Sequence, residues 1–135
     1  MAARSKTPFV LTLLSCLSAC HQGYEDIEVR GEGFYWTFVR AGADKKLGTE
    51  DDLIFHRELL IEQGSRVRLH IRSNDYIYTL RVPELDLNEV AVPDLTFTYK
   101  FVAERLGRYD LPVDPLCGVN FLHDNTMMGE IVVFK

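Results

Sequence analysis

Cysteine is scarce in this chain of 135 residues, which holds only Cys16, Cys20 and Cys117. This scarcity excludes a disulfide-rich framework and a zinc site built from paired cysteines. The sequence also lacks a Ser–His–Asp order and a glycine-rich nucleotide-binding loop, so hydrolase and transferase chemistry have no support. No stretch after residue 20 is apolar enough to span a bilayer.

The first twenty residues have the pattern of a secretory signal. Arg4 and Lys6 give a basic start, an apolar stretch follows at 8–17, and small residues precede Cys20. Such a segment is too short to span a bilayer as a mature helix. Its end, "LSAC", resembles the bacterial lipobox, which implies cleavage before Cys20 and lipidation of that thiol; an uncleaved anchor or a chance cysteine is the alternative.

Residues 1–19 are therefore expected to be a lipoprotein-type signal peptide, residues 20–32 a polar tether and residues 33–135 one domain. We expect the domain to be exported and held by lipid on a bacterial membrane, where it faces the periplasm or the cell exterior. With Cys16 removed and Cys20 lipidated, Cys117 is the only thiol of the folded part. It must then be buried, paired with another chain or bound to a metal.

Acidic residues outnumber basic ones. The chain has 15 Lys and Arg against 20 Asp and Glu. Removal of the signal takes away two basic residues and leaves 13 against 20, a net charge of −7. This balance argues against nucleic acid or an anionic membrane surface as a partner and favours a basic protein surface.

Seven segments have strand character, and no long stretch has a helical period. The clearest is "SRVRLHIRS", in which Val67, Leu69 and Ile71 alternate with polar residues and predict one buried face. Turn residues separate the segments, so the pattern predicts an all-β domain, a Greek-key sandwich or barrel. The seven segments are 33–40, 52–59, 65–73, 75–83, 95–102, 107–113 and 129–135.

The segment 33–40 is rich in aromatic residues. Alternation along a strand predicts that Phe34, Trp36 and Phe38 face the core, with Tyr35 and Thr37 on the opposite face.

Soft metal-binding atoms gather near the end of the chain. Cys117, His123, Met127 and Met128 lie within twelve residues, just before an apolar strand-like run. Thiolate, imidazole and thioether are the donors that copper prefers. A buried thiol with core methionines is the other interpretation of the same residues.

Taken together, the segments resemble the copper-bearing domain of cytochrome c oxidase subunit II. The similar stretches are "WTFVRAGADKKLGTEDDL", "IRSNDYIYTLRVPELDLNEVAVP", "GRYDLPVDPLCG" and "MMGEIVV", in the family's order. The resemblance covers most of residues 30–135 and implies a cupredoxin-like β-sandwich. The membrane hairpin that precedes this domain in the family is absent from the similar region, and the lipobox would replace it as an anchor.

The family's binuclear copper site needs two bridging thiolates and two histidines. Here the first cysteine position holds Val113 and the strand histidine position holds Tyr78. His123 follows Cys117 by six residues, where the family has four. We therefore expect no binuclear copper centre.

The residues that remain predict a site for one copper ion, held by Cys117, His123 and Met127. The domain would then be a non-catalytic electron-transfer subunit. Its partners would be a basic redox protein such as a c-type cytochrome, or membrane oxidase subunits. A further ligand would have to come from four candidates: Tyr78, Asp110, Asp114 and Asn120.

Two alternatives stay open. The domain is metal-free in the first, like subunit II of quinol oxidases, and serves as a docking or scaffold part of a respiratory oxidase. In the second it is a copper-delivery protein, which would need an exposed surface rich in Met or His.

Overall fold

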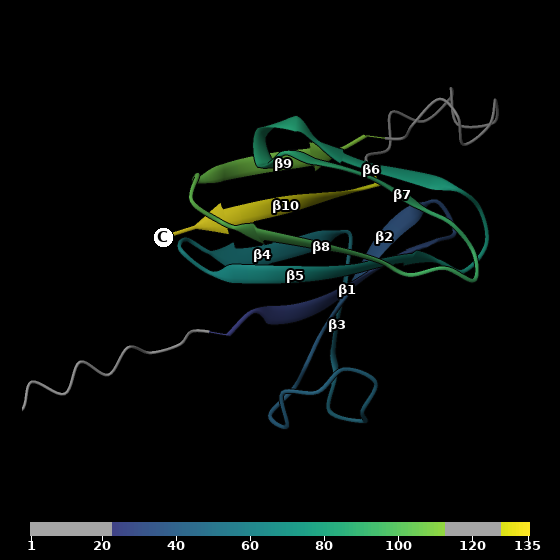
Figure 1. The fold of residues 1–135 in the computed structure, drawn as a ribbon, viewed down its shortest axis with the longest axis horizontal. Helices are drawn as coiled ribbons and strands as arrows, with labels where there is room; N and C mark the ends of the chain where they lie inside the picture. The colour runs from purple at the N-terminus through teal and green to yellow at the C-terminus, as the bar shows by residue number, and fades with distance from the viewer. Residues whose placement is uncertain (1–22, 113–127) are drawn as a thin grey trace, which may run out of the picture.

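Strands make up nearly all of the regular structure. The computed structural model describes residues 23–112 and 128–135, and Figure 1 shows their arrangement. Over this part of the chain the prediction of an all-β fold is confirmed. The only helical element described is the single 3-10 turn η1, so no helix among these residues has the length to cross a membrane. The strands are β1 (Glu25–Glu32), β2 (Tyr35–Arg40), β3 (Leu53–His56), β4 (Glu58–Glu62), β5 (Arg66–Ser73), β6 (Tyr78–Val82), β7 (Leu87–Ala91), β8 (Phe97–Val102), β9 (Gly107–Leu111) and β10 (Gly129–Phe134), with η1 at Pro83–Leu85.

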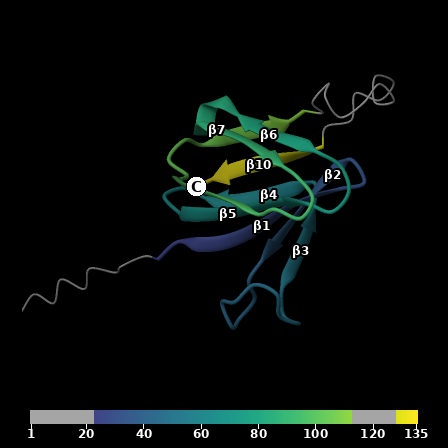
Figure 2. The same ribbon diagram turned by 45° about the vertical axis from the view of Figure 1, so that its right-hand side comes forward.

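Three sheets enclose one core. The largest has the order β3-β2-β1-β5-β8, the second β4-β10-β9, and β6 pairs with β7 in the third. In Figures 1 and 2, β9 and β10 lie on one side of the molecule and β1 and β5 on the other. Buried residues from all three sheets form a single apolar cluster between them. Burial of this apolar surface is the main force that holds the layers together.

β5 shows the predicted alternation. Val67, Leu69 and Ile71 are fully buried, and Arg68 and His70 lie on the outer face. β5 pairs with β1 in parallel and with β8 antiparallel, so it occupies an inner position of the large sheet.

β2 follows the prediction in part. Trp36 and Phe38 are fully buried, as expected, and Phe34 precedes the strand with a positive φ of 67° and packs against the core. Thr37 lies on the outer face but is only 4% exposed. Its neighbours in the register, Arg30 and His56, flank it, and its hydroxyl lies 3.3 Å from the His56 Nδ1.

The prediction of a tether over 20–32 is wrong for its second half. Residues 25–32 form β1, a central strand whose Ile27 and Val29 are fully buried. The polar residues that suggested a tether, such as Asp26 and Glu28, alternate with these two and face outward. The sequence pattern was therefore that of a half-buried strand.

The predicted strand over 52–59 is divided between two sheets. Arg57 has a positive φ of 65°, which ends β3 and starts β4. Its amide donates to the Trp36 carbonyl, and its own carbonyl accepts from the Glu130 amide. This residue thus links the edge of the large sheet to the edge of the three-stranded sheet.

Candidate functional site

One end of the sandwich carries the attachment points of residues 113–127. The Met128 amide donates to the Leu111 carbonyl at 2.9 Å, and the Met128 carbonyl accepts from the Trp36 amide at 2.8 Å. Met128 itself is fully buried. The segment that contains Cys117, His123 and Met127 therefore leaves and re-enters the fold at adjacent positions.

Tyr78 lies at this same end, where β6 begins. Its ring is fully buried, 5.6 Å from the Trp36 ring between centroids. The ring packs directly on the backbone of Gly31, where an added Cβ would lie 2.4 Å from a Tyr78 ring carbon. Only glycine fits at position 31 next to this tyrosine.

The Tyr78 hydroxyl is held by Asp75. It donates to the Asp75 carboxylate at 2.6 Å and accepts from the Phe34 amide at 3.3 Å. Both the donor and an acceptor capacity of the hydroxyl are therefore used within the protein. A metal ligand at this position would have to give up the hydrogen bond to a carboxylate.

Asp75 also receives hydrogen bonds from two backbone amides, those of Gly33 and Tyr76, each at 2.7 Å. Burial raises the pKa of this carboxyl. The hydrogen bonds from Tyr78 and from the two amides lower it by more, so the pKa lies below its usual value of 3.8. The ionised Asp75 carboxylate therefore links the turn before β2 to the start of β6.

The other predicted ligands divide between two regions. Asp110 is exposed on the outer face of β9, and its side chain points away from the core. Within residues 23–112 and 128–135, no three His, Cys, Asp or Glu side chains converge as a metal site would require. The described residues thus supply no metal cluster of their own. The remaining predicted site residues lie outside the described residues: Cys20, Asp114, Cys117, Asn120, His123 and Met127.

Three carboxylates form a row beside the attachment points. Glu130 of β10 lies opposite Glu58 of β4 and opposite Asp110 of β9, and all three face outward. We call them the acidic row. Arg108 donates to Glu130 at 3.1 Å, so the row keeps an excess of negative charge. The sequence signal for it was the outward polar position in each strand, but its assembly depends on pairings between distant segments.

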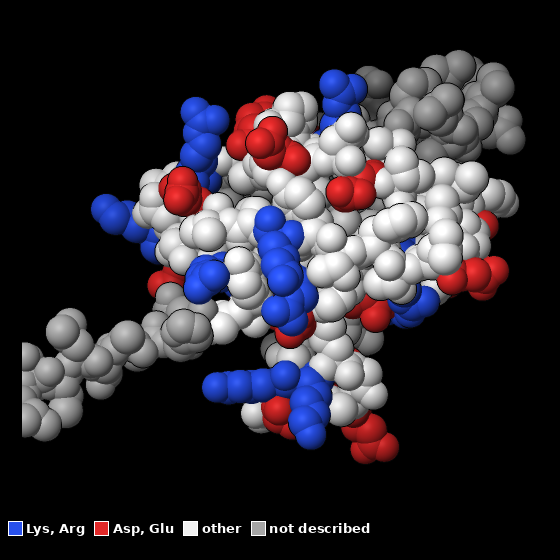
Figure 3. Space-filling view, viewed as in Figure 1, with Lys and Arg blue, Asp and Glu red and all other residues white. Residues whose placement is uncertain are grey.

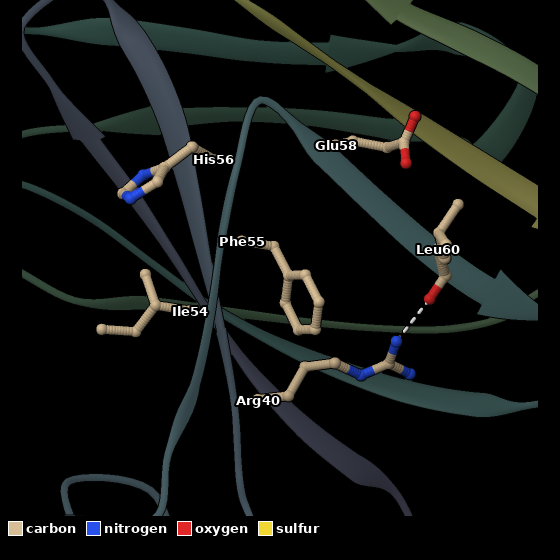
Figure 4. Close-up of a pocket in the computed structure, with 6 residues that line it drawn as sticks. All are labelled: Arg40, Ile54, Phe55, His56, Glu58 and Leu60. Carbon is tan, nitrogen blue, oxygen red and sulfur yellow. Dashed lines mark hydrogen bonds between the residues drawn. The ribbon is translucent and has the colours of Figure 1, made fainter.

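A cavity of about 310 Å³ opens between the edge strands β3 and β4. Figure 4 shows the Phe55 ring pointing toward Arg40 and Leu60, whereas Ile54 and His56 lie on the other side of β3. Arg40 donates a hydrogen bond to the Leu60 carbonyl across this opening. Exposed apolar side chains at 54, 55 and 60 make it a surface for contact rather than for chemistry.

The Asp75 carboxylate should make stability depend on pH. Because its pKa is lowered by folding, its contribution is full above the unfolded value of 3.8 and is lost as pH falls through the folded value. We expect Asp75→Asn to lower the free energy of unfolding by about 1 kcal/mol at pH 7, since the site is partly exposed. The loss should shrink below about pH 3.8 in urea unfolding.

Glu104→Gln is the matched control, because it neutralises an exposed carboxylate elsewhere and should change stability little at either pH. A loss for Asp75→Asn that stays the same at both pH values would contradict the assigned role of the ionised carboxylate.

Comparison with known proteins links this geometry to one family. No family model matches the chain. Over 92 residues it is 29% identical to cytochrome c oxidase subunit 2 of Thermostichus vulcanus, a match that covers 68% of this chain and 25% of that protein. It is 24% identical over 115 residues to the alternative cytochrome c oxidase subunit 2 of Bradyrhizobium diazoefficiens, with 69% and 42% covered. The matches thus span a quarter to less than half of these relatives' lengths.

Solved structures give the fold. The periplasmic domain of subunit II of cytochrome oxidase from Bradyrhizobium japonicum superposes with a TM-score of 0.61, at 18% identity, over 82% of this chain and 84% of that one. The same kind of domain, in a mixed disulfide intermediate with thioredoxin-like TlpA, gives 0.64 at 18% identity, with 82% of both chains covered. A heme-copper terminal oxidase dimer gives 0.60 at 20% identity, over 87% and 69%. The predicted resemblance and the cupredoxin-like fold are therefore confirmed: this chain has the fold of the periplasmic domain of cytochrome c oxidase subunit II.

Proposed function

We propose that this protein is an exported, lipid-anchored domain of the subunit II type that carries electrons in a respiratory chain through one copper ion. Lipid on Cys20 would hold it at the membrane. Its role would be that of an electron carrier within a larger oxidase, in keeping with the copper-type donors Cys117, His123 and Met127. The similarity to two cytochrome c oxidase subunits 2 supports the assignment to respiration.

The attachment of residues 113–127 is the observation that carries the copper proposal. Cys117, His123 and Met127 lie on one segment whose two ends meet at Leu111 and Met128. Because both flanks of the segment are held at this end of the fold, we propose that its donors bind copper there. Copper bound there would accept and release one electron.

The sequence, together with the contacts of Tyr78, explains why we propose one ion and not two. At the position of the family's strand histidine, the Tyr78 hydroxyl is bonded to Asp75. Val113 at the first cysteine position has no donor atom. A single thiolate from Cys117 is left, and two copper ions held close together would need two bridging sulfurs. Of the further candidates, Asp110 faces outward from β9, so we propose Asp114 or Asn120, on the same segment as Cys117, as the additional ligand.

The acidic row supports a basic electron-transfer partner. Glu58, Glu130 and Asp110 flank the strands from which residues 113–127 depart. A basic redox protein such as a c-type cytochrome would be drawn to this surface, close to the proposed copper.

Copper binding can be tested by colour. A thiolate–copper pair absorbs strongly in visible light, so the protein loaded with copper should be coloured. Cys117→Ser should abolish the colour and His123→Ala should weaken copper binding, whereas Met127→Leu should keep the metal and shift its reduction potential. Cys16→Ser is the matched control, because residue 16 would be removed with the signal. Protein that stays colourless at micromolar free copper would contradict the proposal.

Docking can be tested by neutralising carboxylates on two different surfaces. Glu58→Gln combined with Glu130→Gln, both in the acidic row, should slow association with a basic c-type cytochrome several-fold at low salt and flatten its salt dependence, because steering weakens with the charge. Stopped-flow kinetics measure the association rate. The control pair Glu84→Gln and Glu104→Gln removes the same charge from another surface and should change the rate little. Equal effects of both pairs would rule out docking at the acidic row.

A metal-free docking subunit is the second candidate. The bonded Tyr78 hydroxyl favours it, as does the apolar opening between β3 and β4, which could take a neighbouring subunit of an oxidase. Under this function the protein would bind no copper and would co-purify in equal amounts with membrane oxidase subunits. The colour test therefore separates the two functions.

A further inference from the structure

The outer face of the large sheet carries more Lys and Arg than Asp and Glu on its strands β1, β5 and β8, unlike the chain as a whole. Outward side chains of β1, β5 and β8 lie in cross-strand rows, such as Asp26, Arg68 and Lys100. Two lysines of the β2–β3 loop, Lys45 and Lys46, line the same shallow hollow of about 770 Å³ as Arg68 and Arg72. We call this surface the basic face. On the three strands its charged members are Arg30, Arg66, Arg68, Arg72 and Lys100, against Asp26, Glu28 and Glu32. The β2–β3 loop adds Lys45 and Lys46 together with Asp44, Glu50, Asp51 and Asp52.

Two carboxylates are shared among the cations of this face. Asp26 lies 3.2 Å from the Arg68 guanidinium and 2.8 Å from the His70 ring. Glu28 accepts from Arg72 at 3.1 Å. On the strands, five Lys and Arg against three carboxylates leave two positive charges in excess, on a chain whose net charge is −5.

Figure 3 shows Lys and Arg side chains down the middle of the molecule, over β8 and β5, and again over the loop between β2 and β3 below them. The carboxylates of that loop are engaged with its own backbone: Asp51 accepts from the Asp44 amide, and Asp52 accepts from the Gly48 amide. They shape the loop that presents Lys45 and Lys46.

The positive charge is concentrated where the chain enters the sheet. The Tyr24 ring, just before β1, lies 4.5 Å from the Arg66 guanidinium, 5.3 Å from that of Arg68 and 5.2 Å from the Lys100 ammonium. Arg66 also donates a hydrogen bond to the Tyr24 hydroxyl at 3.1 Å. This hydrogen bond and the nearby cations lower the pKa of the Tyr24 phenol, which indicates a local positive field.

The position of Tyr24, just before β1, also indicates which surface would lie close to the basic face. Tyr24 is the fourth residue after Cys20, and a chain of four residue steps reaches at most about 14 Å. A lipid on Cys20 would therefore bring the Tyr24 end of the basic face to within one or two Debye lengths of the bilayer surface. An anionic surface at that distance attracts Lys and Arg, strengthening binding by roughly fivefold for each side chain near the surface.

We propose that the basic face lies against the anionic headgroups of the membrane that anchors the chain and so orients the domain. This inference rests on the proposed lipid anchor. It differs from the sequence-based expectation that an acidic protein avoids anionic membranes, because net charge averages over surfaces with different local charge. With the basic face toward lipid, the acidic row on the three-stranded sheet stays accessible to a partner.

Lysine labelling of the full lipidated chain on vesicles tests the orientation. A membrane-impermeant amine reagent is applied at low dose, and mass spectrometry reads each lysine. On vesicles with phosphatidylglycerol in phosphatidylcholine, Lys45, Lys46 and Lys100 should react several-fold more slowly than on phosphatidylcholine alone. Lys135, beyond the end of β10 on the other sheet, is the internal control and should react equally on both. High salt should abolish the difference.

A matched pair of double variants separates the face from general charge. Arg66→Gln with Arg72→Gln should reduce the protection of Lys100 on anionic vesicles, whereas Arg81→Gln with Arg108→Gln removes the same charge elsewhere and should leave it. Circular dichroism checks that each variant is folded.

Equal labelling of the three lysines on both vesicles, or protection of Lys135 together with them, would overturn the inference. Protection in native membranes but not on anionic vesicles would also overturn it and point to an acidic protein. A chain that does not attach to either vesicle would overturn the lipid anchor and the inference with it, but would leave the copper and docking proposals standing.

Discussion

The hydrogen bond from Tyr78 to Asp75 determines how one end of this sandwich is built. It ties the start of β6 to the turn before β2, because the Asp75 carboxylate also accepts from the Gly33 amide. The Tyr78 ring then packs against Trp36, whose backbone holds Met128. The resemblance to subunit II places a ligand histidine at this position, whereas the Tyr78 ring is buried in the core and its hydroxyl is hydrogen-bonded to Asp75.

Charge is divided between two faces of the domain. The three-stranded sheet presents the acidic row, and the large sheet presents the basic face. This division gives each surface a separate proposed role, one toward a soluble electron-transfer partner and one toward the membrane. The acidic row also borders the strands that lead into residues 113–127, so docking and electron transfer would occur at neighbouring positions.

Local alternation allowed the fold to be predicted where strands were regular. Val67, Leu69 and Ile71 gave β5 correctly, and Trp36 and Phe38 gave the core face of β2. β1 was missed because charged residues surround Ile27 and Val29 and outweighed the alternation. β7 was missed too, since its pattern makes sense only beside β6.

The site was less predictable, because its contacts join distant residues. Tyr78 stood out as a replaced histidine, but its contacts with the Phe34 amide and the Trp36 ring bridge more than forty positions in the sequence. The acidic row depends on the pairing of β10 with both β4 and β9, and the basic face on the pairing of β1 with β5. Net charge gave one sign for the whole chain and concealed both surfaces.

The central claim is that this end of the sandwich holds no more than one copper ion. Electron paramagnetic resonance of the copper-loaded protein tests it most directly, because the hyperfine pattern reports how many copper nuclei share the unpaired electron. We predict the pattern of a single copper nucleus, lost in Cys117→Ser. A pattern from an electron shared equally by two copper nuclei would contradict the account.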